Sequence, residues 1–69
     1  MSYAVVIEHA ASNFSAYVPD LPGCIATGAS VGEIERNIRE AIELHIEALR
    51  EQGAAIPPPT SESELVDVA

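Results

Sequence analysis

Carboxylates are the most abundant chemically active groups in this sequence of 69 residues. Eleven Asp and Glu residues stand against three arginines, and the formal net charge is −8 at pH 7. A two-metal hydrolase needs several carboxylates that converge on cations ~3.5–4 Å apart. Asp20, Glu8 and the glutamates of residues 33–51 are the candidates, but their spacing spreads the glutamates along the outer face of one predicted helix. We therefore expect no catalytic metal site.

Three other side chains have groups that catalysis can use. His9 and His45 each lack a positioned nucleophile, and such histidines are usually packing or surface residues. Cys24 has no basic neighbour in the sequence that would lower its pKa, so we expect a small packing residue. One cysteine permits no intrachain disulfide, and the Cys and His residues lack zinc spacing. We predict a protein that is not an enzyme and binds no metal or cofactor.

A stiff loop, Pro19-Asp20-Leu21-Pro22-Gly23, separates two apolar runs. Each proline fixes its own φ angle and restrains the residue before it, whereas glycine permits turns that other residues avoid. Such a loop loses little entropy on binding and can serve as a preorganised contact. It can equally be a connection that only sets the register of two strands. The residues of the predicted partner contact are Tyr17, Pro19, Asp20, Leu21, Pro22 and Gly23.

Three short strands are predicted before residue 30. Residues 3–8 (YAVVIE) are apolar and rich in β-branched side chains, residues 14–18 (FSAYV) alternate, and residues 24–29 (CIATGA) form a weaker strand. The small polar turn at residues 9–13 makes the first two an antiparallel hairpin. Gly28, in the third strand, indicates a close approach of another backbone segment or a bulge.

One long helix is predicted for residues 31–52. Ser30 and Glu33 have the spacing of a capping box, and Gly53 is suited to end the helix. Isoleucine recurs every four residues, so one apolar stripe runs along the helix and is expected to be buried against the sheet. The stripe consists of Ile34, Ile38, Ile42 and Ile46.

The segment after the helix completes the predicted topology. The three prolines of residues 57–59 form a stiff connector, and residues 65–68 (LVDV) have the pattern of one more short strand. The order β-β-β-α-β defines an α+β fold. A right-handed helix crossover then predicts one sheet with spatial order 3-2-1-4 and the long helix on one of its faces.

The other face of this sheet has no helix to cover it. Tyr3 or Ala4, together with Val6 and Tyr17, are candidates for that face. An apolar sheet face in so small a protein is either an interface or a liability. A chain of this size buries roughly 60% of the surface that its unfolded form exposes, and it has no disulfide or metal to support it. We therefore expect a homo-oligomer, a dimer or a tetramer, formed through this face or a strand edge.

The negative charge limits the possible partners. It repels phosphate, so we expect no direct binding of nucleic acid by this chain alone. It suits a basic protein partner, although acidic surfaces also simply keep small proteins soluble. No apolar run approaches the ~18 residues of a membrane span. The N-terminus has no basic residue before its short apolar run, unlike a signal peptide, so we expect a cytoplasmic protein.

Four segments together resemble one known family: YAVVIE, FSAYVPDLPGCIATGAS, EIERNIREAIELHIEALREQG and IPPPTSESELVDV. They are similar to the HicB antitoxins of type II toxin–antitoxin systems and to HicB-like orphans. The most specific part is residues 19–24 after an aromatic strand, and the second is IPPPTS after a helix that ends in glycine. The resemblance implies a partial ribonuclease-H-like fold of the same β-β-β-α-β order.

The resemblance also implies a function. HicB proteins pair with HicA toxins, small basic proteins with a double-stranded-RNA-binding-domain fold that cleave mRNA, and the antitoxin domain covers the toxin's active site. Many members carry a second, C-terminal DNA-binding domain. Because this sequence stops at Ala69, we expect a single HicB-like antitoxin domain over residues 1–69 without a DNA-binding domain. The alternative is a stand-alone oligomeric accessory or protein-interaction domain with no toxin partner.

Overall fold

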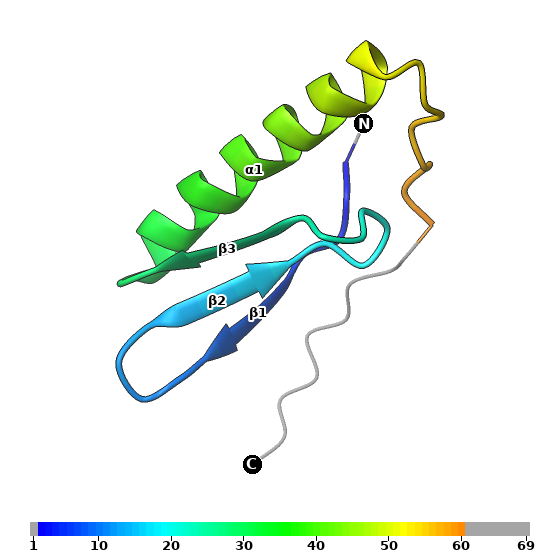
Figure 1. Ribbon diagram of the computed structural model, residues 1–69. Helices are drawn as coiled ribbons and strands as arrows, with labels where there is room; N and C mark the ends of the chain where they lie inside the picture. The colour runs from blue at the N-terminus through cyan, green and yellow to red at the C-terminus, as the bar shows by residue number, and fades with distance from the viewer. Residues whose placement is uncertain (1, 61–69) are drawn as a thin grey trace.

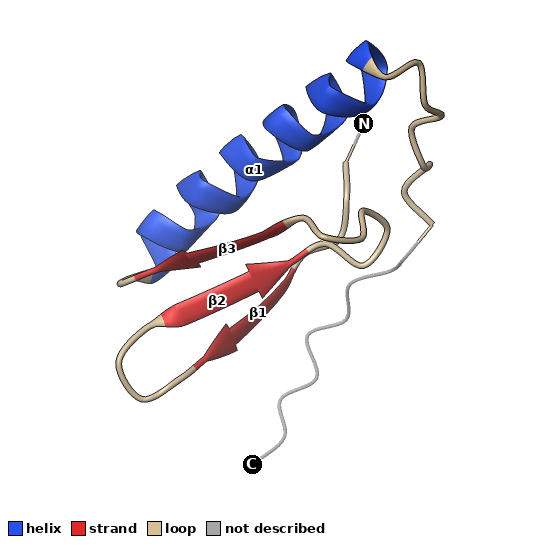
Figure 2. Cartoon of the chain, viewed as in Figure 1, coloured by secondary structure: helices blue, strands red, loops and turns tan. Residues whose placement is uncertain are grey.

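The structure is a computed structural model that describes residues 2–60, in which one long helix packs on one face of a small antiparallel sheet (Figures 1 and 2). The strands are β1 (Val6–His9), β2 (Phe14–Tyr17) and β3 (Ile25–Gly28), and the helix is α1 (Val31–Glu51). The strands lie in the order β1-β2-β3, with β1 and β3 each antiparallel to β2. These elements confirm the predicted α+β class and the β-β-β-α order.

The sheet of the described residues has three strands in the order 1-2-3, not four in the order 3-2-1-4. The fourth strand predicted at residues 65–68 lies outside the described residues. Within residues 2–60, β1 pairs with β2 on one side and no strand pairs with its other edge. β1 also begins later than predicted, at Val6, which pairs with Tyr17 at the end of β2. After Val18 the chain enters the turns of the following loop, so β2 offers no partner to the residues before Val6.

The register of the sheet places alternating rows on its two faces. Ala16 is paired with Ile7 on β1 and with Ala26 on β3, and its buried side chain faces α1. The next row contains Tyr17, paired with Val6 and Ile25. Because successive residues of a strand point to opposite faces, this second row faces away from the helix.

The start of α1 is fastened directly to β3. The Ser30 hydroxyl accepts the Glu33 amide N–H at 3.1 Å, which confirms the predicted N-cap. A Cβ placed on Gly28 would lie 2.8 Å from the amide nitrogen of Ile34, so the glycine marks the close backbone approach that the sequence indicated. The Asn37 side-chain amide donates to the Thr27 carbonyl at 2.8 Å, which adds a polar tie between helix and sheet.

The end of α1 is a Schellman motif. Gly53 has a φ of 67°, in the left-handed region that glycine adopts without strain. Its N–H donates to the Arg50 carbonyl at 3.1 Å, and the Ala54 N–H donates to the Leu49 carbonyl at 2.9 Å. The helix therefore ends where Gly53 was expected to end it.

The core lies between the sheet and the first half of the helix. Leu21 and Ile34 are fully buried, and Ile38 is nearly so. The prediction of a stripe buried along its whole length was wrong for Ile42 and Ile46, which are half-buried. The reason is length, because a helix of 21 residues spans ~31 Å whereas a four-residue strand spans ~13 Å. The second half of α1 extends past the strands (Figure 1).

Candidate partner-binding surface

The loop between β2 and β3 consists of two consecutive β-turns. The Leu21 N–H donates to the Val18 carbonyl at 3.1 Å, and the Cys24 N–H donates to the Leu21 carbonyl at 3.0 Å. Each turn has proline at its second position, and the second turn has Gly23 at its third position with a φ of 86°. The second turn thus has the proline and the glycine that are typical of a type II turn. The Val18 N–H closes the base of the loop by donating to the Cys24 carbonyl at 3.1 Å.

The loop is held from inside by apolar side chains. Leu21, at the junction of the two turns, is completely buried, and Val18 and Cys24 on either side are nearly so. Burial raises the pKa of the Cys24 thiol, which favours the neutral form, in agreement with a packing role. The loop is consequently both stiff in its backbone and anchored in the core.

The segment that follows the helix is fastened to the same loop. The Thr60 amide N–H donates to Asp20 Oδ2 at 3.0 Å, and the Thr60 hydroxyl donates to Asp20 Oδ1 at 2.9 Å. At the N-terminal side, the Tyr3 hydroxyl donates to the Pro57 carbonyl. We call residues 54–60 the return segment. It connects the far end of α1 to the loop and to the residues before β1.

The predicted contact residues therefore have different positions. Pro19, Pro22 and Gly23 are exposed on the outside of the loop. Leu21 is in the core, out of reach of a partner in this conformation, and Asp20 is half-buried and bonded to Thr60. Three of the predicted contact residues thus form an exposed surface on the loop, whereas Leu21 anchors the loop in the core.

Tyr17, the remaining predicted contact residue, belongs to an apolar row on the outer sheet face. Its neighbours across the sheet are Val6 and Ile25, and the exposed fraction of Ile25 is 70%. Sequence reasoning named Val6 and Tyr17 but missed Ile25, whose alternation with the buried Cys24 was the available signal. Ala4 lies two residues before Val6, which is the spacing of residues on the same sheet face. Tyr3 instead packs against the core on the helix side.

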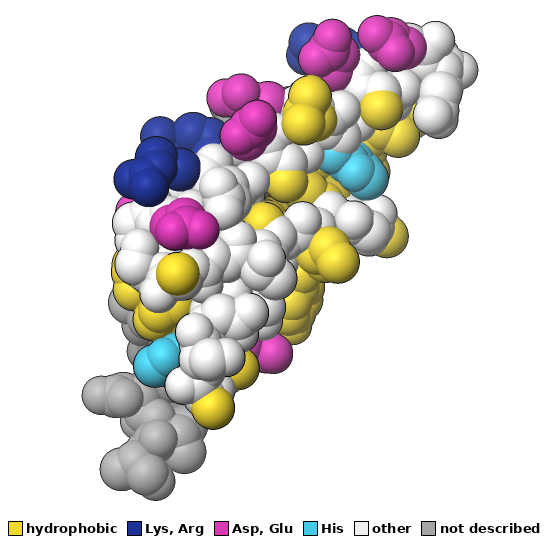
Figure 3. All heavy atoms as spheres, turned by 60° about the vertical axis from the view of Figure 1, so that its left-hand side comes forward, with side chains coloured by type: hydrophobic (Ala, Val, Ile, Leu, Met, Phe, Trp, Pro, Cys, Tyr) yellow, Lys and Arg dark blue, Asp and Glu magenta, His cyan; other side chains and the backbone are white. Residues whose placement is uncertain are grey.

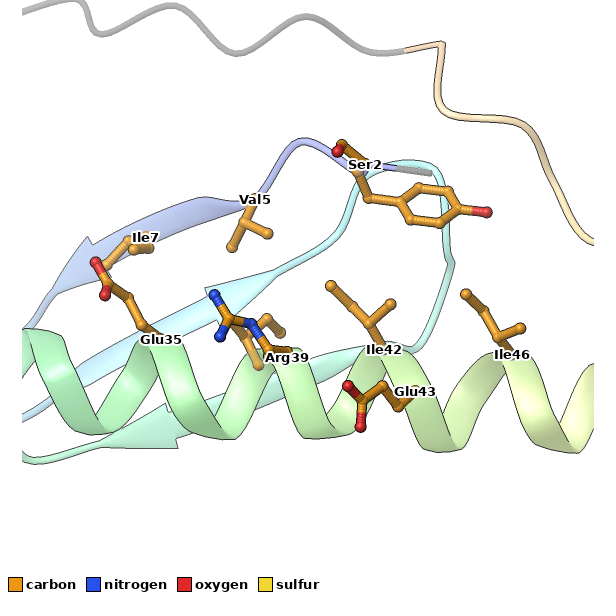
Figure 4. A pocket seen from close by; sticks show the side chains of 10 residues that line it. Ser2, Val5, Ile7, Glu35, Arg39, Ile42, Glu43 and Ile46 are labelled. Atoms are coloured by element: carbon orange, nitrogen blue, oxygen red, sulfur yellow. The ribbon is translucent and has the colours of Figure 1, made fainter.

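A second apolar surface is a groove of about 470 Å³ between α1 and the segment that leads into β1. It exists because α1 packs over β3 and β2 and does not reach β1. In Figure 4, Val5 and Ile7 lie on one side of this space, and Ile42 and Ile46 extend into it from the helix, farther along the groove. Charged side chains lie along its helix side: Glu35, Arg39 and Glu43.

Charged groups gather on the helix rather than on the sheet. Figure 3 shows carboxylates and arginines along the exposed side of α1. His9 lies at the end of β1 with its ring stacked on Phe14, at a centroid distance of 4.2 Å, which is a packing arrangement. Among the residues described, no group of three or more His, Cys, Asp and Glu side chains could hold a metal ion.

Comparison with known proteins identifies the family. The model of the "HicB_like antitoxin of bacterial toxin-antitoxin system" matches residues 3–68, nearly the whole chain. The chain belongs to the HicB-like antitoxin family. The matched residues include the double turn, the long helix and the return segment.

Relatives of this HicB-like chain occur in several organisms. It is 37% identical over 57 residues to an uncharacterized 14.9 kDa protein of Haemophilus phage HP1, covering 83% of this chain and 43% of that one. It is 49% identical over 41 residues to a UPF0150 protein of Helicobacter pylori, covering 59% and 57%. The chain thus spans about half the length of these two relatives. A UPF0150 protein of Thermoplasma acidophilum is 36% identical over 63 residues, covering 90% and 91%.

One solved structure is similar in both fold and sequence. It is a chain of the "HicA3 and HicB3 toxin-antitoxin complex", with a TM-score of 0.75 and 37% identity. The match covers 86% of this HicB-like chain and 70% of that chain. In the part of the present structure that is described, no helix is sufficiently long and apolar to cross a membrane.

Proposed function

We propose that this HicB-like chain is an antitoxin that binds and occludes a small basic, mRNA-cleaving toxin of the HicA type. The observation that carries the proposal is the 37% identity, at a TM-score of 0.75, to a chain solved in a toxin–antitoxin complex. In this proposal the chain catalyses no reaction and needs no cofactor, because it acts by covering the toxin's surface.

Charge supports this mode of action. A surface that binds RNA must itself be positive, and the present chain has a net charge of −8. Its carboxylates compete for such a surface without offering a phosphodiester to cleave. Charge complementarity of this kind raises the association rate more than it deepens the affinity.

The contact surface in this proposal includes the exposed parts of the loop. Pro19, Pro22 and Gly23 form a preorganised surface, since their backbone is fixed by two closed turns. Tyr17, two residues before Pro19 in the sequence, adds a partly exposed ring. Leu21 supports the surface from the core, and Asp20 joins it to the return segment.

The proposal also covers the finer features of the fold. We propose that the three-stranded sheet with its long helix is a partial ribonuclease-H-like fold. The bond of Tyr3 to Pro57 holds the return segment close to the residues before β1, and the bond of Thr60 to Asp20 holds it to the loop between β2 and β3. In this proposal residues 1–69 act as one cytoplasmic domain that self-associates and does not hold DNA by itself.

A second candidate function is a stand-alone oligomeric protein-interaction domain. The apolar row of Val6, Tyr17 and Ile25 favours it, since that surface needs a partner whether or not a toxin exists. The two candidates differ in whether the chain binds a protein that is encoded by an adjacent gene. An adjacent reading frame for a small basic protein favours the antitoxin.

The test is co-expression with the product of any adjacent reading frame that encodes a small basic protein. An antitoxin restores growth to cells that express that protein and copurifies with it in a stable complex. A matched variant, Leu44→Glu, changes an exposed apolar residue on the outside of α1 and should leave both results unchanged. Growth arrest that the chain fails to relieve, with no copurification, would favour the second candidate.

A further inference from the structure

The carboxylate of Asp20 is held at both of its oxygens by one residue. The Thr60 amide N–H donates to Oδ2 at 3.0 Å, and the Thr60 hydroxyl donates to Oδ1 at 2.9 Å. An arginine guanidinium binds a carboxylate in the same bidentate way, with two N–H donors of one group on the two oxygens. Thr60 therefore occupies the position on Asp20 that the guanidinium of a partner would take.

We call the two bonds between Thr60 and Asp20 the clasp, and we propose that an arginine of a partner protein opens it. The guanidinium takes both oxygens of Asp20, displaces Thr60 and releases the end of the return segment. The inference rests on the proposed function, because it needs a basic partner at the loop between β2 and β3. It adds the chemistry of that contact and a conformational consequence of binding.

The clasp lies where a partner can reach it. Both of its hydrogen bonds are exposed, and Thr60 is an exposed residue. Pro19 and Pro22, on the outside of the same loop, are exposed as well. Figure 1 shows the return segment passing from the end of α1 to the side of this loop. A partner that contacts the outside of the loop therefore meets the clasp without any change in the core.

The loop keeps its shape when the clasp opens. Its two turns are closed by the bonds from Leu21 to Val18 and from Cys24 to Leu21, and the Leu21 side chain is fully buried. None of these contacts involves Thr60. The backbone of Asp20 thus stays in place while its carboxylate changes partner, so the exchange requires no refolding of the loop.

The exchange favours an arginine over Thr60. Both Thr60 donors are neutral, whereas a guanidinium is a cation, and charge-assisted hydrogen bonds are roughly twice as strong as neutral ones. A lysine ammonium is a compact point charge without the planar fork of a guanidinium, so it is poorly suited to take both oxygens together. The clasp therefore distinguishes arginine from lysine on the partner.

The release is limited to the end of the return segment. The Tyr3 hydroxyl donates to the Pro57 carbonyl, three residues before Thr60, and this bond does not involve Asp20. Residues 58–60 therefore leave the loop while Pro57 stays tied to the residues before β1. The coupling is reciprocal: whatever holds the return segment on the loop weakens partner binding by the same factor by which the partner loosens the segment.

The first test uses the purified chain and a short polyarginine peptide as the probe, with a polylysine peptide of equal length as the control. The net charge of −8 attracts both peptides. The position of the Thr60 amide signal in NMR spectra reports on the clasp, and Asp20→Ala gives its position when the clasp is open. Polyarginine should move the wild-type signal toward that position, and polylysine should move it much less.

Asp20→Asn keeps one side-chain acceptor but has no carboxylate for a guanidinium, so its Thr60 signal should respond equally to the two peptides. A wild-type signal that neither peptide moves, or that both peptides move equally, overturns the inference. Because this test needs no toxin, it decides the inference even where no basic partner copurifies, a result that refutes the antitoxin proposal alone.

The second test uses the complex with the basic protein encoded by an adjacent reading frame. Thr60→Val removes one competing hydrogen bond, so it should tighten binding about two- to tenfold, the factor that an ordinary hydrogen bond contributes. Thr60→Ser keeps both donors and is the matched control, which should bind like the wild type. Hydrogen exchange at the Thr60 amide should be faster in the complex than in the free chain. Weaker binding by Thr60→Val, or slower exchange at Thr60 in the complex, would show that the clasp supports the contact and would overturn the inference.

Discussion

Asp20 and Thr60 are joined by two hydrogen bonds although 40 positions separate them in the sequence. Both donors belong to Thr60, and both carboxylate oxygens of Asp20 accept. The pair fastens the return segment to the loop between β2 and β3, for which the sequence left open a partner contact or a purely structural connection. Asp20 thus has a structural contact of its own. Every test of its role in partner binding must separate the loss of this contact from the loss of a contact with the partner.

The first prediction is that Asp20→Ala frees the return segment with little effect on the sheet and helix. A hydrogen bond to a charged group contributes ~1.5–3 kcal/mol at most, and these bonds are exposed, so we expect a loss of about 1 kcal/mol in the free energy of unfolding. Amide hydrogen exchange at Thr60 should become much faster. Thr60→Val removes the hydroxyl and keeps the amide, so it should have a smaller effect on both measurements. Unchanged exchange in Asp20→Ala would show that the two bonds are not formed in solution.

The second prediction concerns the gradient of burial along the isoleucine stripe. Ile38→Ala should lower the free energy of unfolding by ~2–5 kcal/mol, because it leaves a cavity in the core. Ile46→Ala should cost clearly less, since Ile46 is half-buried in the part of α1 beyond the strands. Urea unfolding followed by circular dichroism measures the free energy of unfolding of both variants. Equal losses for the two variants would place the second half of the helix in the core as well.

The third prediction separates two glycines that have different constraints. Gly28→Ala should destabilise by ~1–3 kcal/mol, because the new methyl group meets the backbone of Ile34 and neither side can move easily. Gly23→Ala meets no atom but must adopt a positive φ, which costs ~1–2 kcal/mol. A proton spectrum should show altered shifts at the start of α1 for Gly28→Ala alone. Shifts at the helix start caused by Gly23→Ala would contradict this division.

The fourth prediction is a stability change at alkaline pH that depends on Cys24. Burial raises the pKa of its thiol above the ordinary value of 9.0. Above pH ~9 the unfolded chain therefore releases this proton before the folded chain does, and the free energy of unfolding falls as the pH rises. Cys24→Ala should lack this component. Parallel pH profiles for the two proteins would indicate that the thiol is not buried in solution.

Local features of the fold could be predicted well from the sequence. Ser30 and Glu33 marked the helix start, Gly53 marked its end, and Gly28 marked the close approach of helix and strand. Each of these signals depends on neighbours within a few residues, or on a backbone that cannot tolerate a side chain. The alternation of the strands likewise placed Val6 and Tyr17 on one face.

Features that depend on distant segments could not be predicted in the same way. The bonds from Thr60 to Asp20 and from Tyr3 to Pro57 join residues 40 and 54 positions apart, and no periodicity indicates them. The partial exposure of Ile46 depends on the mismatch between helix and strand lengths, which the isoleucine spacing alone does not contain. Leu21 was assigned to the contact surface because it lies between two prolines, whereas the double turn directs its side chain into the core.

The fifth prediction concerns how charge acts in binding the proposed toxin. If the chain occludes a positive RNA-binding surface, association should be fast at low salt and slow on the order of tenfold as ionic strength approaches the physiological value. The Debye length at ~0.15 M is ~8 Å, so the charges closest to the contact should dominate at that salt. Asp20→Lys should slow association most, because the two turns hold this residue at the proposed contact. Glu47→Lys and Glu51→Lys, on the exposed side of α1, should have smaller effects.

Thr60→Val and Asp20→Ala make this comparison specific. Both loosen the return segment, but neither places a positive charge on the loop. An effect of Asp20→Lys that Thr60→Val reproduces would come from release of the return segment and not from charge, because Thr60→Val changes no charge. An effect that grows at low salt and is absent in Thr60→Val would come from electrostatic attraction through the loop. Association that is indifferent to salt, together with full neutralisation of the toxin by Asp20→Lys in cells, would require a contact made elsewhere, and the charged exposed side of α1 would then be the next surface to test.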